Sequence, residues 1–133
     1  MRVLALDYGS ARCGCALSDP TGTLATPIEA VERPATRKGF ARVVELVRDR
    51  EAQRVVVGLP LGLSGADTDQ TREVRAWADR LAAAVAVPVE LYDERFTTAI
   101  AARGPSDRTS EDSRAAAVLL EDWLARHARE VTG

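Results

Sequence analysis

The chain has 133 residues, of which 46% are apolar and 29% charged, and its formal net charge is −2. This composition is that of an ordinary globular domain, and it excludes extensive disorder. No apolar run approaches the roughly 18 residues of a membrane-spanning helix, and Asp7 comes too early for the apolar core of a signal peptide. The sequence therefore predicts one cytoplasmic domain over residues 1–133, with no membrane segment.

The first thirty residues have the pattern of an antiparallel meander. Residues 2–8 are apolar at both sets of alternate positions, which is typical of a central strand covered on both faces. Turns containing Gly9 and Gly22 separate this strand from two further predicted strands, at 13–17 and 23–30. Strands joined by such short turns are expected to pair with their neighbours.

The rest of the chain alternates helices and strands. Apolar residues recur at helical spacing over 40–47 and 74–85, and again over 116–124. Short buried strands are predicted at 54–59 and 88–92. Right-handed crossovers place these two strands parallel to the first, on the side away from the meander. We therefore expect an α/β fold with a five-stranded mixed sheet, in the order 3-2-1-4-5, and helices on both faces.

The available residue types limit the chemistry. Cys13 and Cys15 would point to the same face of a strand, so we expect them to be unbridged core residues. His127 is the only histidine, which excludes most Ser-His-Asp and histidine-rich metal sites. Trp77 and Trp123 lie on apolar helix stripes, where core packing is expected rather than base stacking. Carboxylates, hydroxyls or the backbone must then perform any reaction.

Acidic residues from three distant segments are expected at one edge of the sheet. Ligands of open α/β sheets bind beyond the carboxyl ends of parallel strands, where Asp7 and the pair Asp93–Glu94 fall. Asp112 begins the apolar stripe of the last helix, so its carboxylate should lean toward the sheet. Each acid alone could be an ordinary strand-end or helix-cap residue. Together they suit Mg²⁺ or Mn²⁺, and two such ions can assist hydrolysis of a phosphodiester.

Five segments in chain order carry a resemblance to a known family. They are LALDYGSARCGCALSD (4–19), ATPIEAV (25–31), VVVGLPLGLSG (55–65), PVELYDERFTT (88–98) and DSRAAAVLLEDWL (112–124). Through them the chain resembles the YqgF/RuvX family of the RNase H-like superfamily, which also includes RuvC-type Holliday junction resolvases. The resemblance implies a metal-dependent nuclease that acts in maturation of the 5′ end of pre-16S rRNA, with junction-resolving DNA cleavage as the alternative.

The resemblance also implies which residues form the site. It assigns Asp7, Glu94 and Asp112 as catalytic residues and as ligands of Mg²⁺ or Mn²⁺. Residues after Glu94 would contact a phosphate of the substrate or orient the acid, although a solvated arginine and a helix cap are the ordinary interpretation. These residues are Arg95, Thr97 and Thr98. Two further substrate-binding residues are expected, namely Arg12, the basic residue of the first turn, and Arg114, close to Asp112 in the last helix.

The chain departs from the family pattern mainly in its basic residues. Ala11 stands where a second basic residue is usual, Gly62 replaces an asparagine, and segment 99–111 is short and lacks the expected basic cluster. A basic run near the first helix offers replacement charges, although such runs are usually solvated faces. If the run binds phosphates, affinity should fall steeply with salt. The run consists of Arg33, Arg37, Lys38 and Arg42.

Other functions and assembly states stay open at this stage. The opening LALDYG also resembles the phosphate-binding hairpin of actin-like and sugar-kinase ATPases, but those enclose a nucleotide between two domains, and 133 residues hold one. A nucleic-acid-binding module without catalysis is the other alternative, and the missing basic residues favour it. The chain could be a monomer or a homodimer, and a junction-cutting role favours the two-fold dimer.

Overall fold

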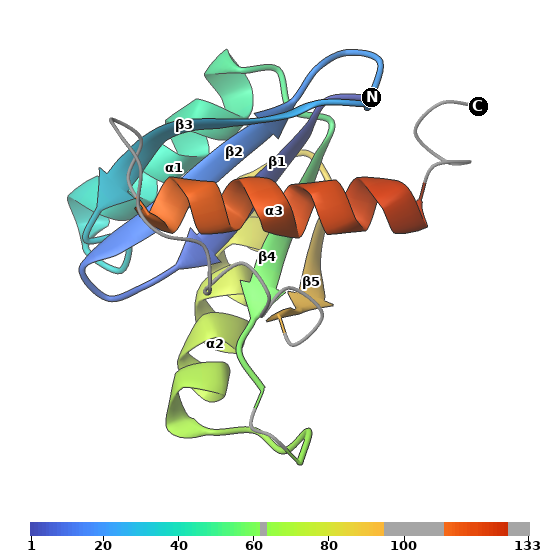
Figure 1. Ribbon diagram of the computed structural model, residues 1–133. Coiled ribbons are helices and arrows are strands. Elements are labelled where there is room, and N and C mark those ends of the chain that lie inside the picture. The colour runs from blue at the N-terminus through green and yellow to red at the C-terminus, as the bar shows by residue number, and fades with distance from the viewer. Residues whose placement is uncertain (62–63, 95–110, 128–133) are drawn as a thin grey trace.

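The computed structural model describes residues 1–61, 64–94 and 111–127, with the backbone alone for Glu111 and Asp112. Among these residues, no helix combines the length and apolar character needed to cross a membrane. Within these ranges eight helices and strands follow one another (Figure 1). They are β1 (Val3–Tyr8), β2 (Arg12–Ser18), β3 (Ala25–Glu32), α1 (Arg37–Asp49), β4 (Arg54–Leu59), α2 (Asp69–Ala84), β5 (Val89–Asp93) and α3 (Glu111–Arg126).

The strands form one mixed sheet in the order β3-β2-β1-β4-β5, which confirms the predicted topology. β2 pairs antiparallel with both β1 and β3, while β1 with β4 and β4 with β5 are parallel pairs. In the parallel pairs Leu6 lies beside Val57 and Gly58 lies beside Tyr92. The carboxyl ends of β1, β4 and β5 therefore share one edge of the sheet.

The turn before β3 is longer than the sequence predicted, and the strand begins at Ala25 rather than at 23. Asp19 causes this difference. Its Oδ1 accepts hydrogen bonds from the backbone N–H groups of Thr23, at 2.8 Å, and of Leu24, at 2.9 Å. Both residues are thereby held in the turn and are not available to the strand ladder. These hydrogen bonds also hold the pKa of Asp19 well below its usual value.

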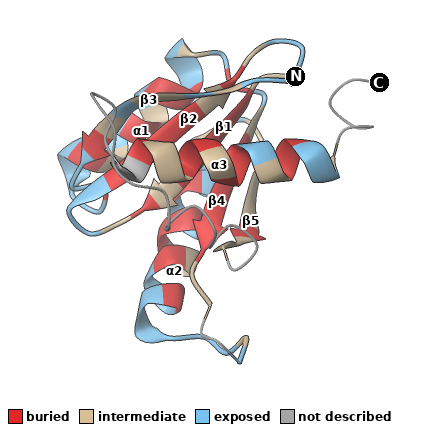
Figure 2. Cartoon of the chain, in the orientation of Figure 1, coloured by how far each residue is buried: buried red, intermediate tan, exposed pale blue. Residues whose placement is uncertain are grey.

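Helices cover both faces of the sheet (Figures 1 and 2). α1 and α2 pack on one face over a core that includes Leu4, Leu6 and Trp77, and α3 packs on the other over Val3 and Val56. Because β1 contributes apolar side chains to both cores, it is the doubly covered strand that its sequence predicted. Both cysteines are buried and not joined in a disulfide, and both tryptophans are buried, as expected.

Polar contacts attach α3 to the sheet at its carboxyl-terminal half. Trp123 Nε1 donates a hydrogen bond to Glu90 Oε2 at 3.2 Å, and the same glutamate pairs with Arg54 at 2.6 Å. The Tyr92 hydroxyl donates a hydrogen bond to Asp122, the residue before Trp123. His127 stacks on Trp123, with ring centroids 4.2 Å apart. These contacts fix the direction of α3, and so they fix where its first turn meets the sheet.

Candidate active site

Asp7 lies near the carboxyl end of β1 and is half-buried. Successive side chains of a strand alternate between faces, and Ala5 packs in the core beneath α3, so Asp7 faces α3 as well. Its neighbours in the sheet are two glycines. Gly14 of β2 pairs with Asp7, and Gly58 of β4 follows Val57, the partner of Leu6. The Asp7 carboxylate therefore stands between two positions that have no side chain.

Glu94 follows β5 directly and lies over β4. A Cβ atom built on Gly58 would be 2.5 Å from Oε1 of Glu94 and 2.9 Å from its Cγ, so this side chain occupies the space above the glycine. Gly58 is about one strand spacing, 4.8 Å, from Asp7 across the sheet. Asp7 and Glu94 thus come from strands that are not adjacent, yet they meet at one edge and one face. Asp93 belongs to β5 and alternates to the opposite face.

Asp112 is the second residue of α3, and its side chain lies outside the described part of the structure. The next residue shows where this turn of the helix is held. Ser113 is fully buried, and its Oγ accepts a hydrogen bond at 3.2 Å from the backbone N–H of Cys15 in β2. The β2–β3 register shifts between Cys13 and Cys15, an irregularity of the kind that turns backbone groups away from the ladder. The first turn of α3 therefore sits on β2 beside Gly14, the partner of Asp7.

The described side chains include no group of three or more His, Cys, Asp or Glu residues arranged to hold a metal ion. The two acids that meet there, Asp7 and Glu94, supply only carboxylate oxygens, the ligand type that Mg²⁺ and Mn²⁺ prefer. Both acids make other interactions in the protein. The donor chemistry fits a hard divalent cation, and Asp112 is the candidate for the third carboxylate.

The predicted substrate contacts are distributed over three regions. Arg12 is the first residue of β2, at the same edge of the sheet as Asp7, and it is exposed. Arg114 follows Ser113 in the first turn of α3 and is half-buried. The remaining three, Arg95, Thr97 and Thr98, lie outside the described residues.

Tyr8 anchors the end of β1 from the opposite face, a role that the sequence analysis missed. Its hydroxyl donates a hydrogen bond to Glu73 of α2, and its ring lies 4.9 Å from that of Trp77. Burial, followed by the effect of Glu73, raises the pKa of Tyr8 to about 12. The tyrosine is therefore neutral at ordinary pH and ties the strand that carries Asp7 to α2.

The roles of Gly58 and Ser113 were not predicted either, although Gly58 was expected at this edge and both residues leave a signal in the sequence. A glycine inside the apolar run VVVGL is unusual, because glycine weakens a strand unless another group approaches closely. Ser113 precedes Ala116 and Ala117 on the apolar stripe of α3. A polar side chain buried at such a position is expected to form a hydrogen bond with a partner. What the sequence could not supply is the identity of that partner, which comes from β2.

Comparisons with known proteins identify the family of the chain and its fold. The model of the RuvX family, described as Holliday junction resolvase, matches residues 1–126. Relatives named as pre-16S rRNA nucleases include one from Maridesulfovibrio salexigens, 40% identical over 95% of this chain and 99% of the relative. Another, from Anaeromyxobacter dehalogenans, is 40% identical over 96% of this chain and 99% of its own length.

Among solved structures, RuvC of T. thermophilus in complex with a Holliday junction substrate has a similar fold. The TM-score is 0.64 at 19% sequence identity, and the match covers 99% of this chain and 97% of the RuvC chain. At this identity the likeness concerns the fold, which is the RNase H-like arrangement of a five-stranded mixed sheet with helices on both faces.

Proposed function

The chain belongs to the RuvX family, and we propose from this that it is a metal-dependent nuclease that hydrolyses phosphodiester bonds during 5′-end maturation of pre-16S rRNA. The observation that carries the proposal is the meeting of Asp7 and Glu94 across Gly58, on the face that α3 covers. Relatives named for pre-16S rRNA support the choice of substrate, because they match nearly the full length of both chains. The expected compartment is the cytoplasm.

The residues proposed to hold the metal are Asp7, Glu94 and Asp112. When bound, two ions of Mg²⁺ or Mn²⁺ would supply charge stabilisation for the attacking and the leaving oxygen of an in-line displacement. The chain's own part is to keep the carboxylates in place before the substrate arrives. β1 is fixed on both faces, and Ser113 holds the first turn of α3 on β2. Fixed carboxylates should give a higher rate than mobile ones, because a misplacement of 1 Å can lower the rate about 100-fold.

Basic residues near the acids would reduce the repulsion between a carboxylate cluster and a phosphate chain. We propose that Arg12 and Arg114 do this from β2 and α3, since one lies at the Asp7 edge and the other in the first turn of α3. Arg95, Thr97 and Thr98 are further candidates for phosphate contacts. Guanidinium groups suit this task, because they can form two parallel hydrogen bonds with a phosphate.

Holliday junction cleavage is the second candidate function. The description of the matching family favours it. A junction has two-fold symmetry, so a chain that resolves junctions is expected to act as a homodimer with two sites. Hydrolysis of a single RNA strand has no such requirement and is compatible with a monomer.

The test compares both substrates under the same conditions. The purified chain is incubated with a labelled RNA that carries the 5′ leader of pre-16S rRNA, and with a labelled four-way DNA junction. Each reaction contains Mg²⁺, Mn²⁺ or a chelator. We expect the RNA to be cleaved when Mg²⁺ or Mn²⁺ is present and to stay intact in the chelator. The Asp7→Asn variant should not cleave it under any of these conditions. Asp49→Asn, an exposed acid at the end of α1, serves as the matched control and should cleave normally.

Each other result has a distinct meaning. Cleavage of the junction alone would favour the resolvase function. Cleavage that survives both the chelator and Asp7→Asn would contradict the proposed site. Binding of RNA with no cleavage under any condition would identify a non-catalytic binding module.

A further inference from the structure

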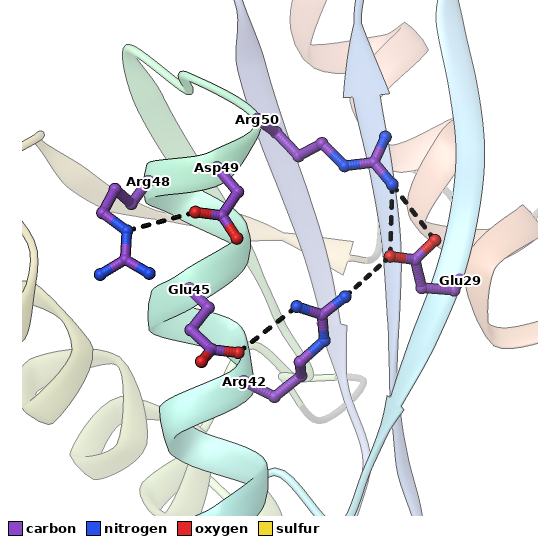
Figure 3. Close-up of polar contacts among 6 residues, drawn as sticks. All are labelled: Glu29, Arg42, Glu45, Arg48, Asp49 and Arg50. Atoms are coloured by element: carbon purple, nitrogen blue, oxygen red, sulfur yellow. Dashed lines mark hydrogen bonds and ion pairs between the residues drawn. The ribbon is translucent and has the colours of Figure 1, made fainter.

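The basic residues on and around α1 divide into two sets. In the first set each arginine pairs with an acid (Figure 3). Arg42 and Arg50 both contact Glu29 of β3, at 3.1 and 3.2 Å, and Arg48 contacts Asp49 at 3.2 Å. The charges of this set are thus balanced within the protein. Arg42 was part of the basic run considered as a phosphate site, and its contact with Glu29 offsets the charge that it could offer to a phosphate.

The second set, here called the edge basic cluster, consists of Arg12, Arg33, Arg37 and Lys38. All four side chains are exposed, and none forms an ion pair with any residue that the structure describes. One exposed acid, Glu32, lies among them opposite Arg12, so the cluster carries four positive charges against one negative charge, in a chain whose net charge is −2. A surface of this kind attracts an anionic partner.

The strand register places the edge basic cluster at the same edge of the sheet as Asp7. Tyr8 pairs with Cys13, and Arg12 pairs with Glu32, the last residue of β3. Arg33 therefore comes directly beyond this edge, and α1 starts there at Arg37. β3 is two strand spacings from β1, about 10 Å. The cluster thus lies at the edge that carries the acids, on the β3 side, and its two α1 residues belong to the layer on the opposite face of the sheet from α3.

The backbone that carries the cluster is held firmly. Arg33 has a left-handed conformation, with φ of 47°, which costs a residue other than glycine roughly 1 kcal/mol. Its N–H donates to the carbonyl of Ala11 at 2.9 Å, and its carbonyl accepts from the N–H and hydroxyl of Thr36, at 3.1 and 2.7 Å. Gly39 permits this approach, because a Cβ there would overlap the carbonyl oxygen of Arg33. Such a strained position persists only when its surroundings enforce it.

We propose that the edge basic cluster binds the phosphate backbone of the RNA strand on the β3 side of the cleavage site. The proposal rests on the nuclease function for its choice of nucleic acid as the partner. An RNA strand entering a carboxylate site needs positive charge along its path, and this cluster supplies an exposed excess of positive charge at the Asp7 edge. The first turn of α1 adds the positive end of a helix dipole to the same surface.

The experiment measures binding of a short fluorescently labelled single-stranded RNA to the full chain by anisotropy, with a chelator present so that no cleavage occurs. The test variant is Arg37→Ala with Lys38→Ala, and the control is Arg42→Ala with Arg48→Ala. Both remove two positive charges from the same helix. We expect the test variant to bind about tenfold or more weakly at about 0.1 M salt. Its salt slope should be smaller by about 1.4, since each phosphate contact in a single strand contributes about 0.7.

Several outcomes would overturn this proposal. Equal weakening of the test and control variants would mean that only overall charge matters, and unchanged binding of the test variant would exclude the cluster. Competition by polyglutamate as effective as that by unlabelled RNA would indicate an acidic protein partner instead. Arg37→Lys with Lys38→Arg, which keeps both charges, should bind normally, and thermal unfolding of each variant checks the fold.

The two proposals fail in different ways. If Asp7→Asn still cleaves RNA, the nuclease site is wrong, whereas the binding measurements in chelator stand by themselves. If Asp7→Asn is inactive but the edge variants bind RNA normally, the nuclease proposal survives and the binding surface is wrong.

Discussion

Gly58 and Glu94 compete for one space: a Cβ atom on the glycine would lie 2.5 Å from Oε1 of the glutamate. Position 58 is therefore a glycine because the Glu94 side chain needs the space. The strand itself does not explain this residue, because a larger residue would suit β4 better. This relationship makes the position of Glu94 sensitive to a change on a different strand.

Gly58→Ala should displace the Glu94 carboxylate while leaving the fold intact. The new methyl group meets a flexible side chain, which can rotate away, so we expect the free energy of unfolding to change by less than about 1 kcal/mol. Cleavage should fall roughly 100-fold, because the carboxylate moves by about 1 Å or more. The measurements are urea unfolding and single-turnover cleavage. Normal activity in this variant would mean that Glu94 is not needed where it lies.

Gly39→Ala is the contrasting change. Its Cβ would lie 2.6 Å from the carbonyl oxygen of Glu32 and would overlap that of Arg33, both of which are main-chain atoms that cannot rotate away. We expect a loss of about 2 kcal/mol or more in unfolding free energy, in the range of severe single substitutions. A stability equal to that of Gly58→Ala would contradict this distinction between side-chain and main-chain neighbours.

Ser113→Ala should reduce both stability and activity. It leaves the buried N–H of Cys15 without its acceptor, which costs about 1–3 kcal/mol, and it releases the first turn of α3 that carries Asp112. Ser18→Ala is the matched control, because the Ser18 hydroxyl accepts from Val3 N–H at 2.7 Å at the opposite edge of the sheet. We expect a similar loss of stability there with normal cleavage. Equal activity of the two variants would exclude a positioning role for Ser113.

Divalent metal should stabilise the folded chain. A ligand at 100 times its Kd raises the free energy of unfolding by about 2.7 kcal/mol, so Mn²⁺ should raise the Tm and a chelator should reverse the effect. Asp7→Asn should abolish most of this shift, because it removes a proposed ligand. Differential scanning calorimetry measures it without any substrate. If Mn²⁺ raises the Tm of the unmodified chain and of Asp7→Asn equally, the ion binds at a site that does not include Asp7.

Alkaline pH should destabilise the protein through its two tyrosines. In the folded state burial raises the pKa of Tyr8 to about 12, and burial also raises the pKa of Tyr92. An unfolded tyrosine has a pKa of about 10. The stabilising contribution is therefore complete below about pH 10 and is lost as the pH rises toward 12. Urea unfolding across this range should show the loss, and Tyr8→Phe with Tyr92→Phe should remove most of it.

The sheet was predictable because its signals are local. The run of apolar residues in β1 identifies a doubly covered strand, and the helical crossovers then determine which strands are parallel to it. The same topology places Asp7 and Glu94 at one edge. The start of β3 was not predictable, because it depends on how the Asp19 side chain folds back onto the turn.

Contacts between distant elements were also beyond the sequence. Arg42 and Arg37 look alike in the basic run, yet only the packing of α1 against β3 brings Glu29 to one and not to the other. Likewise, the irregular pairing at Cys15 decides that Ser113 has a backbone partner. Such pairings depend on three-dimensional register, which residue type and spacing do not specify.

The stack of His127 on Trp123, with ring planes 13° apart, gives the protein a natural spectroscopic label. Because the chain has a single histidine, its imidazole protons form one resolved pair of NMR signals, and the indole ring current displaces them from their usual frequencies. Unwinding of the last turn of α3 would separate the two rings and return these signals to the frequencies of a free imidazole. Fraying of this helix end can therefore be followed in solution without isotopes or attached dyes.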